Sequence, residues 1–123
     1  MSRGLGDVYK RQRLIERYLG NLEGEERSKY DAKKYWDYQL NSDDEGVEKI
    51  QDVFHRCESF LEDIVSKHDD TDTILIVSHG AVVRALHHIL KKTNRQKNLR
   101  NFSIPTCFCQ KYTIKKEDFI HER

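Results

Sequence analysis

The stretch Ile-Leu-Ile-Val-Ser-His-Gly, residues 74–80, runs directly into Ala-Val-Val-Arg-Ala-Leu, residues 81–86. Its first four residues are a continuous apolar run rich in β-branched side chains, which is typical of a strand buried on both faces of a parallel sheet. Beyond Gly80 the apolar residues recur every three or four positions, which predicts an amphipathic helix. The sequence therefore predicts an α/β fold with His79 at the carboxyl end of a strand.

This position makes His79 a candidate phosphate ligand. Ligands of open α/β sheets bind beyond the carboxyl ends of the strands, and the free N–H groups at the start of a helix bind phosphate. The positive end of the helix disfavours a protonated imidazole, whereas a bound phosphate favours it. A histidine between these two influences suits phosphoryl chemistry. From the residues alone, an ordinary turn histidine is an equally good interpretation.

The composition excludes several classes of protein. The chain has 123 residues, enough for one domain at most, and its 22 basic and 21 acidic residues give a net charge of +1. This balance implies no general attraction to nucleic acid or to a membrane surface, and no apolar stretch approaches the ~20 residues of a membrane span. The apolar share of 37% is low for a two-sided α/β core, which indicates that core-forming sequence is missing.

The three cysteines, Cys57, Cys107 and Cys109, lack the paired spacing of a zinc site. They fit free thiols in a reducing compartment, so we expect a cytoplasmic protein. The adjacent pair His87 and His88 is also a poor chelate, because neighbouring helical positions diverge by roughly 100°. We expect no metal and no other cofactor.

Three segments precede the first long helix. Residues 1–12 resemble the translation of a sequencing adapter, so we expect a non-native or disordered leader there and exclude it from the fold. Residues 13–24 are predicted to be a loop. Residues 25–40 carry several aromatic side chains, which predict one or two short helices whose rings cover the edge of the core.

The remaining chain is predicted to alternate helix, strand and loop. Residues 47–67 carry an apolar stripe at helical spacing and predict a long helix. Residues 91–100 form a basic connector that we expect to be a solvated loop. Residues 107–114 predict a final strand near the edge of the sheet.

Two motifs in this order resemble the histidine phosphatase superfamily, also called the phosphoglycerate mutase-like family. Residues 16–24, Glu-Arg-Tyr-Leu-Gly-Asn-Leu-Glu-Gly, are similar to that family's E-R-x-x-G-x-x-E-G loop. Residues 77–84, Val-Ser-His-Gly-Ala-Val-Val-Arg, are similar to its S-H-G-x-x-x-R motif around a second histidine. The similarity extends over almost all of residues 13–114.

The resemblance implies a fold and a domain arrangement. The fold would be a partial three-layer α/β/α structure of the phosphoglycerate mutase-like kind, with a mostly parallel sheet whose N-terminal strand and helices are missing. Residues 13–123 would then be the C-terminal part of a single histidine phosphatase domain.

The resemblance also implies a mechanism in which one histidine attacks phosphorus and a glutamate protonates the leaving oxygen. By matching position, Glu16 would be the proton donor and His79 the second, phosphate-contacting histidine. Gly80 and Ala81 would offer backbone N–H groups to the substrate. Arg17 would either pair with the substrate or hold the loop. The substrate would be a small phosphorylated metabolite.

The chain departs from the family pattern at the nucleophile. None of its six histidines stands in the Arg-His-Gly motif that carries the attacking imidazole. We therefore expect this chain to be a fragment of a phosphomonoesterase, inactive by itself and poorly stable. Leu19 and Ala81 stand where true mutases usually have tyrosine and asparagine, which favours a phosphatase over a mutase.

Two other functions compete with this interpretation. One is a non-catalytic phosphate-binding remnant, which an upstream Arg-His-Gly in the same reading frame would exclude. The other is a nucleic-acid-binding module that uses residues 91–100. The balanced charge and the lack of interleaved aromatic residues argue against that module.

Overall fold

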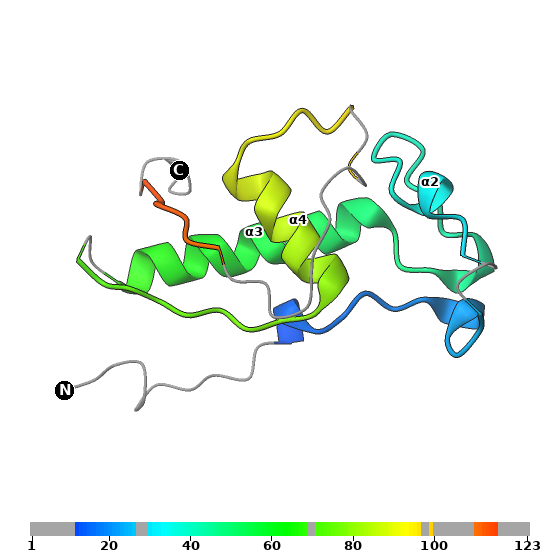
Figure 1. Cartoon of the computed structure of the whole chain (residues 1–123), viewed down its shortest axis with the longest axis horizontal. Coiled ribbons are helices and arrows are strands. Elements are labelled where there is room, and N and C mark those ends of the chain that lie inside the picture. Colours follow the sequence, from blue (N-terminus) through cyan, green and yellow to red (C-terminus); the bar gives the residue numbers. More distant parts are fainter. Residues whose placement is uncertain (1–11, 27–29, 69–70, 97–98, 100–109, 116–123) are drawn as a thin grey trace.

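The computed structural model describes residues 12–26, 30–68, 71–96, 99 and 110–115. Two long helices dominate it, α3 and α4, and four short helical turns surround their ends (Figure 1). In chain order the elements are η1 (Gln12–Leu14), η2 (Gly20–Leu22), α2 (Ala32–Tyr35), η4 (Asp44–Gly46), α3 (Ile50–Lys67) and α4 (Gly80–Leu90). None of the helices in these ranges is long and apolar enough to cross a membrane.

Helix α3 confirms the predicted long helix, although it begins at Ile50 rather than Val47. Val47 and Lys49 have extended backbone angles, and the amides of Asp52 and Val53 donate to the carbonyl of Lys49 at 3.0 and 3.2 Å. Its apolar stripe is fully buried at Phe54 and at the other inward positions: Ile50, Val53, Cys57 and Leu61. Burial raises the pKa of the Cys57 thiol to about 12, so this cysteine is inert.

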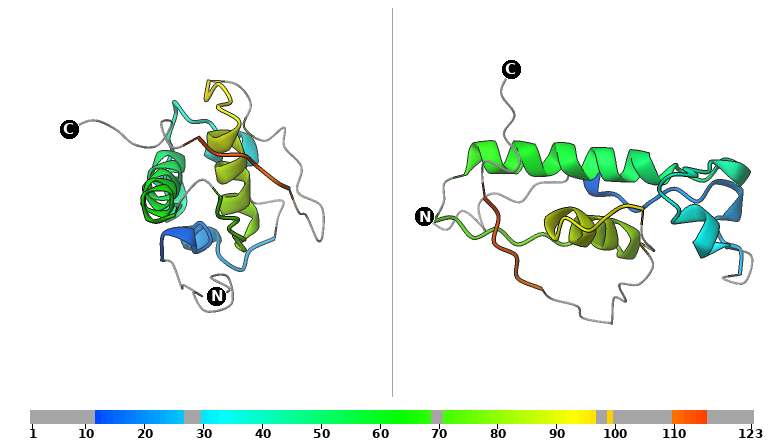
Figure 2. Two further views of the ribbon diagram at one scale, coloured as in Figure 1. Left: turned by 90° about the vertical axis from the view of Figure 1, so that its left-hand side faces the viewer. Right: turned by 90° about the horizontal axis from the view of Figure 1, so that it is seen from above.

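Helix α4 crosses α3 and closes the core from the other side (Figures 1 and 2). Val82 and Ala85 are completely buried, and Leu86 and Ile89 are 7% exposed. Trp36 and Leu99 join the same cluster. Burying each large apolar side chain contributes about 1.5–3 kcal/mol, so the contact between α3 and α4 is the main source of stability in this part of the chain.

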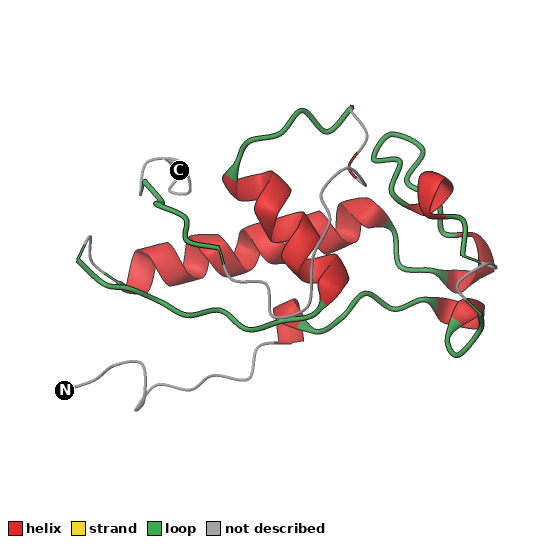
Figure 3. Ribbon diagram, in the orientation of Figure 1, coloured by secondary structure: helices red, strands yellow, loops and turns green. Residues whose placement is uncertain are grey.

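The predicted parallel sheet is wrong for the described residues, which contain helices and loops but no strand (Figure 3). Residues 73–79 do run extended along α3 to the start of α4, as the apolar pattern implied (Figure 1). A strand, however, exists only through hydrogen bonds to a neighbouring strand. Among the described residues no such neighbour lies beside this segment. The α/β class, including the partial three-layer fold, is therefore not observed.

The other predictions have mixed outcomes. The final strand expected over residues 107–114 is a loop where it is described, at 110–114, and residues 107–109 lie outside the described part. Residues 1–11, which make up nearly all of the expected leader, also lie outside it. Between residues 25 and 40 the short helix α2 is confirmed, and Tyr35 and Trp36 at its end are buried.

The loop that carries the first motif is fixed to α3 by arginines. Arg56 Nη1 donates to the carbonyls of Arg13 and Ile15, both at 2.7 Å, while its Nε donates to Glu48 Oε2 at 2.9 Å. Arg13 in turn forms an ion pair of 2.8 Å with Asp63. At the far end of the loop, Gly20 has a φ of +55°, and a Cβ there would collide with the backbone of η4. This tight contact sets the path of the motif loop.

Candidate functional site

The two motifs meet at the N-terminus of α4. Glu16 and Ala81 are 65 positions apart, yet Ala81 N donates to Glu16 Oε1 at 3.2 Å and reaches Oε2 at 3.4 Å. The amide of Arg17 also donates to Glu16 Oε1, at 3.0 Å. A carboxylate is stabilised by the positive end of a helix. The predicted proton donor thus occupies the position where an anion would bind to α4.

His79 is the residue that precedes α4, with extended backbone angles of −105° and 167°. Its carbonyl accepts the first helical hydrogen bond, from Val83 N at 2.8 Å, but its side chain makes no capping bond. The imidazole is exposed, as is Gly80. The neighbouring Ser78 Oγ donates to Leu14 O at 2.7 Å, which ties this turn to η1. The structure therefore leaves His79 exposed to solvent, two residues before the amide that contacts the Glu16 carboxylate.

Arg17 is buried, with only 2% of its surface exposed. Its Nε donates to Glu48 O at 2.8 Å, and its Nη1 donates to Tyr30 Oη at 3.4 Å. Burial lowers the pKa of Arg17, partly offset by the nearby Glu48 and Tyr30. Its Nη2 is buried and has no hydrogen-bond partner in the described part of the chain. These contacts fit the loop-holding role, and the unsatisfied Nη2 leaves the substrate-pairing role open.

Trp36 connects the two motifs, which sequence reasoning did not predict. Its ring centroid lies 5.6 Å from the guanidinium carbon of Arg17 in the first motif and 5.0 Å from that of Arg84 in the second. Such contacts are worth about 0.5–2 kcal/mol each, the higher values where water is excluded. The only hint in the sequence was that this single tryptophan lies in an aromatic cluster.

A stacked pair of tyrosines lies beside Arg17 and helps to hold the first motif. The rings of Tyr30 and Tyr35 are 5.2 Å apart and nearly parallel, and Tyr35 Oη donates to Asp44 O at 3.2 Å. Burial raises the pKa of Tyr30, so its hydroxyl stays neutral beside Arg17. The aromatic segment therefore packs against the core edge, as the sequence indicated, and it also fixes the first motif.

His87 and His88 have structural contacts instead of a common site. His88 Nε2 lies 2.7 Å from Leu99 O, and His87 Nδ1 lies 2.7 Å from Tyr112 Oη. Burial is the main cause that lowers the pKa of both side chains. Within the described ranges no group of three or more His, Cys, Asp or Glu side chains is placed to hold a metal ion.

The arrangement can bind an anion and hold a proton donor beside it. An exposed imidazole, the first N–H groups of α4 and a carboxylate converge where the two motifs meet. Helix N-termini and histidines stabilise phosphate oxygens, and a carboxylic acid can protonate a leaving oxygen. No backbone or side-chain group in this set attacks phosphorus in the family's manner, because the Arg-His-Gly motif is absent from the sequence.

Comparison with known proteins identifies the family. The sequence profile of the histidine phosphatase superfamily (branch 1) matches residues 2–123, so the chain belongs to this superfamily. The chain is also 31% identical over 90 residues to phosphoglycerate mutase-like protein 4 of Arabidopsis thaliana. That match covers 68% of this chain and 39% of the relative, so the chain spans well under half of the relative's length. No solved structure matches the chain.

Proposed function

We propose that this member of the histidine phosphatase superfamily is part of a cytoplasmic phosphomonoesterase that acts on a small phosphorylated metabolite. The observation that supports it best is the hydrogen bond between Glu16 and Ala81 N, which joins the proton-donor motif to the second-histidine motif. The two residues are 65 positions apart in the sequence.

Each group has a defined role in this proposal. The exposed His79 and the N–H groups of Gly80 and Ala81 neutralise the phosphate oxygens. Glu16, once protonated, gives its proton to the leaving alcohol oxygen, a contribution of about 10²–10⁴ in rate. The attacking histidine, which would form the phosphohistidine, comes from a segment not contained in these 123 residues. This chain by itself is therefore expected to bind phosphate without hydrolysing its esters.

A titration with inorganic phosphate, followed by NMR through the backbone amide signals, tests whether this site binds phosphate. The amides of Gly80 and Ala81 should shift with a saturable dependence, and His79→Ala should weaken binding about tenfold or more. His55→Ala is the matched control, because His55 is exposed on α3. A titration in which the amides of Gly80 and Ala81 do not shift, or in which both variants behave alike, would contradict the proposal.

A non-catalytic phosphate-binding protein is the second candidate, and the missing Arg-His-Gly motif favours it. An accurate long read of the genomic sequence before the codon for Arg13 separates the two candidates. An open frame that encodes Arg-His-Gly supports the phosphatase. A native frame that stops near Arg13 supports the binding protein.

A mutase is a variant of the catalytic proposal, in agreement with the name of the Arabidopsis relative. The two reactions differ in what accepts the phosphoryl group, which is water in a phosphatase and a substrate hydroxyl in a mutase. Phosphorus NMR of a reaction by the longer protein tells free phosphate from a rearranged ester. Leu19 and Ala81 lead us to expect free phosphate.

A further inference from the structure

The first turn of α4 is capped by a side chain from a distant part of the chain. The opening residues of a helix leave backbone N–H groups without helical partners, and the side chain of the residue before the helix often accepts from one of them. His79 holds that position and makes no such bond with its side chain. Ala81 N instead donates to Glu16 Oε1 at 3.2 Å and lies 3.4 Å from Oε2. Glu16 therefore supplies the cap that the residue before α4 does not.

The backbone on both sides of Glu16 is fixed, whereas the capping contact itself is open to water. The carbonyl of Ile15 accepts from Arg56 Nη1 at 2.7 Å, and Arg17 is only 2% exposed. Glu16 is exposed, and so is its hydrogen bond to Ala81 N. Separation of the carboxylate from this amide therefore requires a change of side-chain rotamer and no movement of the loop.

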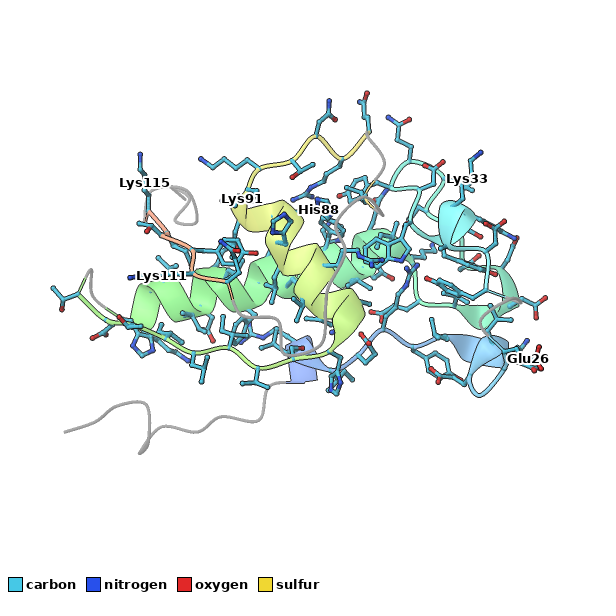
Figure 4. All side chains as sticks on the ribbon, in the orientation of Figure 1. Glu26, Lys33, His88, Lys91, Lys111 and Lys115 are labelled. Atoms are coloured by element: carbon cyan, nitrogen blue, oxygen red, sulfur yellow. The ribbon has the colours of Figure 1, made fainter. Side chains whose placement is uncertain are left out.

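The amide that Glu16 occupies is one that the proposed phosphate site needs. Each residue has a single backbone N–H to donate, so a phosphate oxygen and the Glu16 carboxylate cannot both hold a full hydrogen bond from Ala81 N. Two anions this close also repel each other. The lysines labelled in Figure 4 lie away from this end of α4 and give no countercharge there: Lys33, Lys91, Lys111 and Lys115. Binding of one anion at this amide therefore opposes binding of the other.

We propose that the Glu16 carboxylate competes with phosphate for the N-terminus of α4 and must leave it when phosphate binds. This inference rests on the proposed function, because it concerns the same phosphate site. In the unliganded chain the carboxylate accepts from Ala81 N. An incoming phosphate oxygen takes over this N–H, and the Glu16 side chain rotates away while its backbone stays in place. The displaced carboxyl group then remains beside the bound ester, where the proposed reaction requires a proton donor.

The competition determines the sign of a mutational effect. The apparent affinity for phosphate falls with the fraction of molecules in which the binding-competent state is populated. A carboxylate at a helix N-terminus is stabilised only modestly, so removing it should tighten phosphate binding about three- to tenfold. A residue that only assisted phosphate binding would give the opposite result, because its loss would weaken binding.

Titration of the intact chain with inorganic phosphate, followed by NMR at the amides of Gly80 and Ala81, measures this effect. Glu16→Gln should bind phosphate about three- to tenfold more tightly than the wild type, because an uncharged amide oxygen is a weaker acceptor than a carboxylate. Glu23→Gln is the matched control, since its carboxylate lies in the same loop and accepts from Leu19 N at 2.8 Å. This control removes the same charge and should keep the wild-type affinity. Circular dichroism verifies that the helices persist in both variants.

The variant Glu16→Asp separates displacement from general repulsion between negative charges. Aspartate keeps the charge but is one methylene shorter, so from the same fixed backbone its carboxylate no longer reaches Ala81 N. Phosphate binding should therefore tighten in Glu16→Asp as it does in Glu16→Gln. General repulsion would instead leave the affinity of Glu16→Asp at the wild-type value, which would overturn the proposal.

The displacement can also be followed in the unmutated chain through the carbon-13 signals of its glutamate carboxyl groups. Phosphate should shift the Glu16 carboxyl signal in step with the Ala81 amide signal and leave the Glu23 signal in place. If phosphate binds but the Glu16 signal stays constant, or if Glu16→Gln does not tighten binding, the competition is overturned and the phosphate site stands. Equal tightening by Glu23→Gln would also overturn it. If phosphate shifts neither amide in any of these chains, the proposed function fails together with this inference.

Discussion

Two segments run beside α3, residues 13–19 and residues 73–79, and they are held very differently. The first is fixed by hydrogen bonds from Arg56 to two of its carbonyls, and by the burial of Arg17 within it. The second is fixed by one hydroxyl bond from Ser78 and by the packing of Ile76. The loop with the proton-donor motif is thus built into the helical core, whereas the segment leading to His79 rests on its surface.

This difference shows which parts of the site the described chain can organise by itself. Charged hydrogen bonds to backbone carbonyls hold the first motif without any further element. The second motif has its helix in place, but within the described ranges no strand pairs with the segment before it. The comparison predicts that mutations around the two segments will have unequal effects.

Truncating a core side chain of α3, which lies beneath both segments, should reduce the stability of the chain the most. Phe54 is fully buried in α3, and Phe54→Ala should lower the free energy of unfolding by about 3–5 kcal/mol because it leaves a cavity. Leu75→Ala should change it by less than about 0.5 kcal/mol, because the side chain is already in water. Urea denaturation followed by circular dichroism measures both. Equal losses would mean that Leu75 is part of the core of the chain.

Cutting the anchor of the first segment should have the next largest effect. Arg56→Ala removes bonds to Arg13 O and Ile15 O and the ion pair with Glu48, and we expect a loss of about 2–3 kcal/mol. Arg56→Lys should recover only part of this loss, since an ammonium group cannot replace the planar fork of arginine. Hydrogen exchange at residues 13–19 should accelerate in both variants. Full recovery by lysine would show that charge, not geometry, holds the loop.

Cutting the anchor of the second segment should cost less. Ser78→Ala removes the hydroxyl bond to Leu14 O, and we expect a loss of about 1 kcal/mol together with faster exchange at the start of α4. Ser66→Ala is a matched control, because its hydroxyl donates to Asp63 O on the exposed end of α3. The Ser66 variant should lose less stability. A larger loss there would show that the Ser78 bond does not hold the segment.

Acidification should have the smallest effect within the range near neutral pH. Burial lowers the pKa of His87 and His88 below the ordinary value of 6.5, so the unfolded chain binds protons first as the pH falls. Stability is therefore fully present above pH 6.5 and declines as the pH falls toward the folded pKa values. Urea unfolding at a series of pH values should show a shallower slope for His88→Gln.

The sequence predicted the helices because each one carries its own signal. The apolar stripe of α3 repeats at helical spacing, and its residues are buried as expected except for Ile64, which is half-buried. The same logic failed for residues 74–77, because an apolar β-branched run specifies an extended backbone but not a partner strand. A helix closes its hydrogen bonds within itself, whereas a sheet depends on residues far away in the chain.

The site also divides into features that local sequence predicts and features that depend on contacts between distant residues. The family motifs predicted that Glu16 and His79 belong together, and the structure brings Glu16 to the helix that His79 opens. The burial of Arg17 and its contact with Trp36 could not be read from the motifs, since they depend on how residues 30–36 fold over the loop. Local spacing identifies candidate residues, and tertiary packing decides which of them face solvent.

Trp36 is the single tryptophan of the chain, and it lies between an arginine of each motif. Its intrinsic fluorescence therefore reports whether the two motifs are in contact through Trp36. The wavelength and quenching of this emission should respond to separation of Arg17 or Arg84 from the ring, even when α3 remains intact. Rapid-mixing fluorescence could thus time the assembly of the site in the unlabelled protein, independently of any substrate.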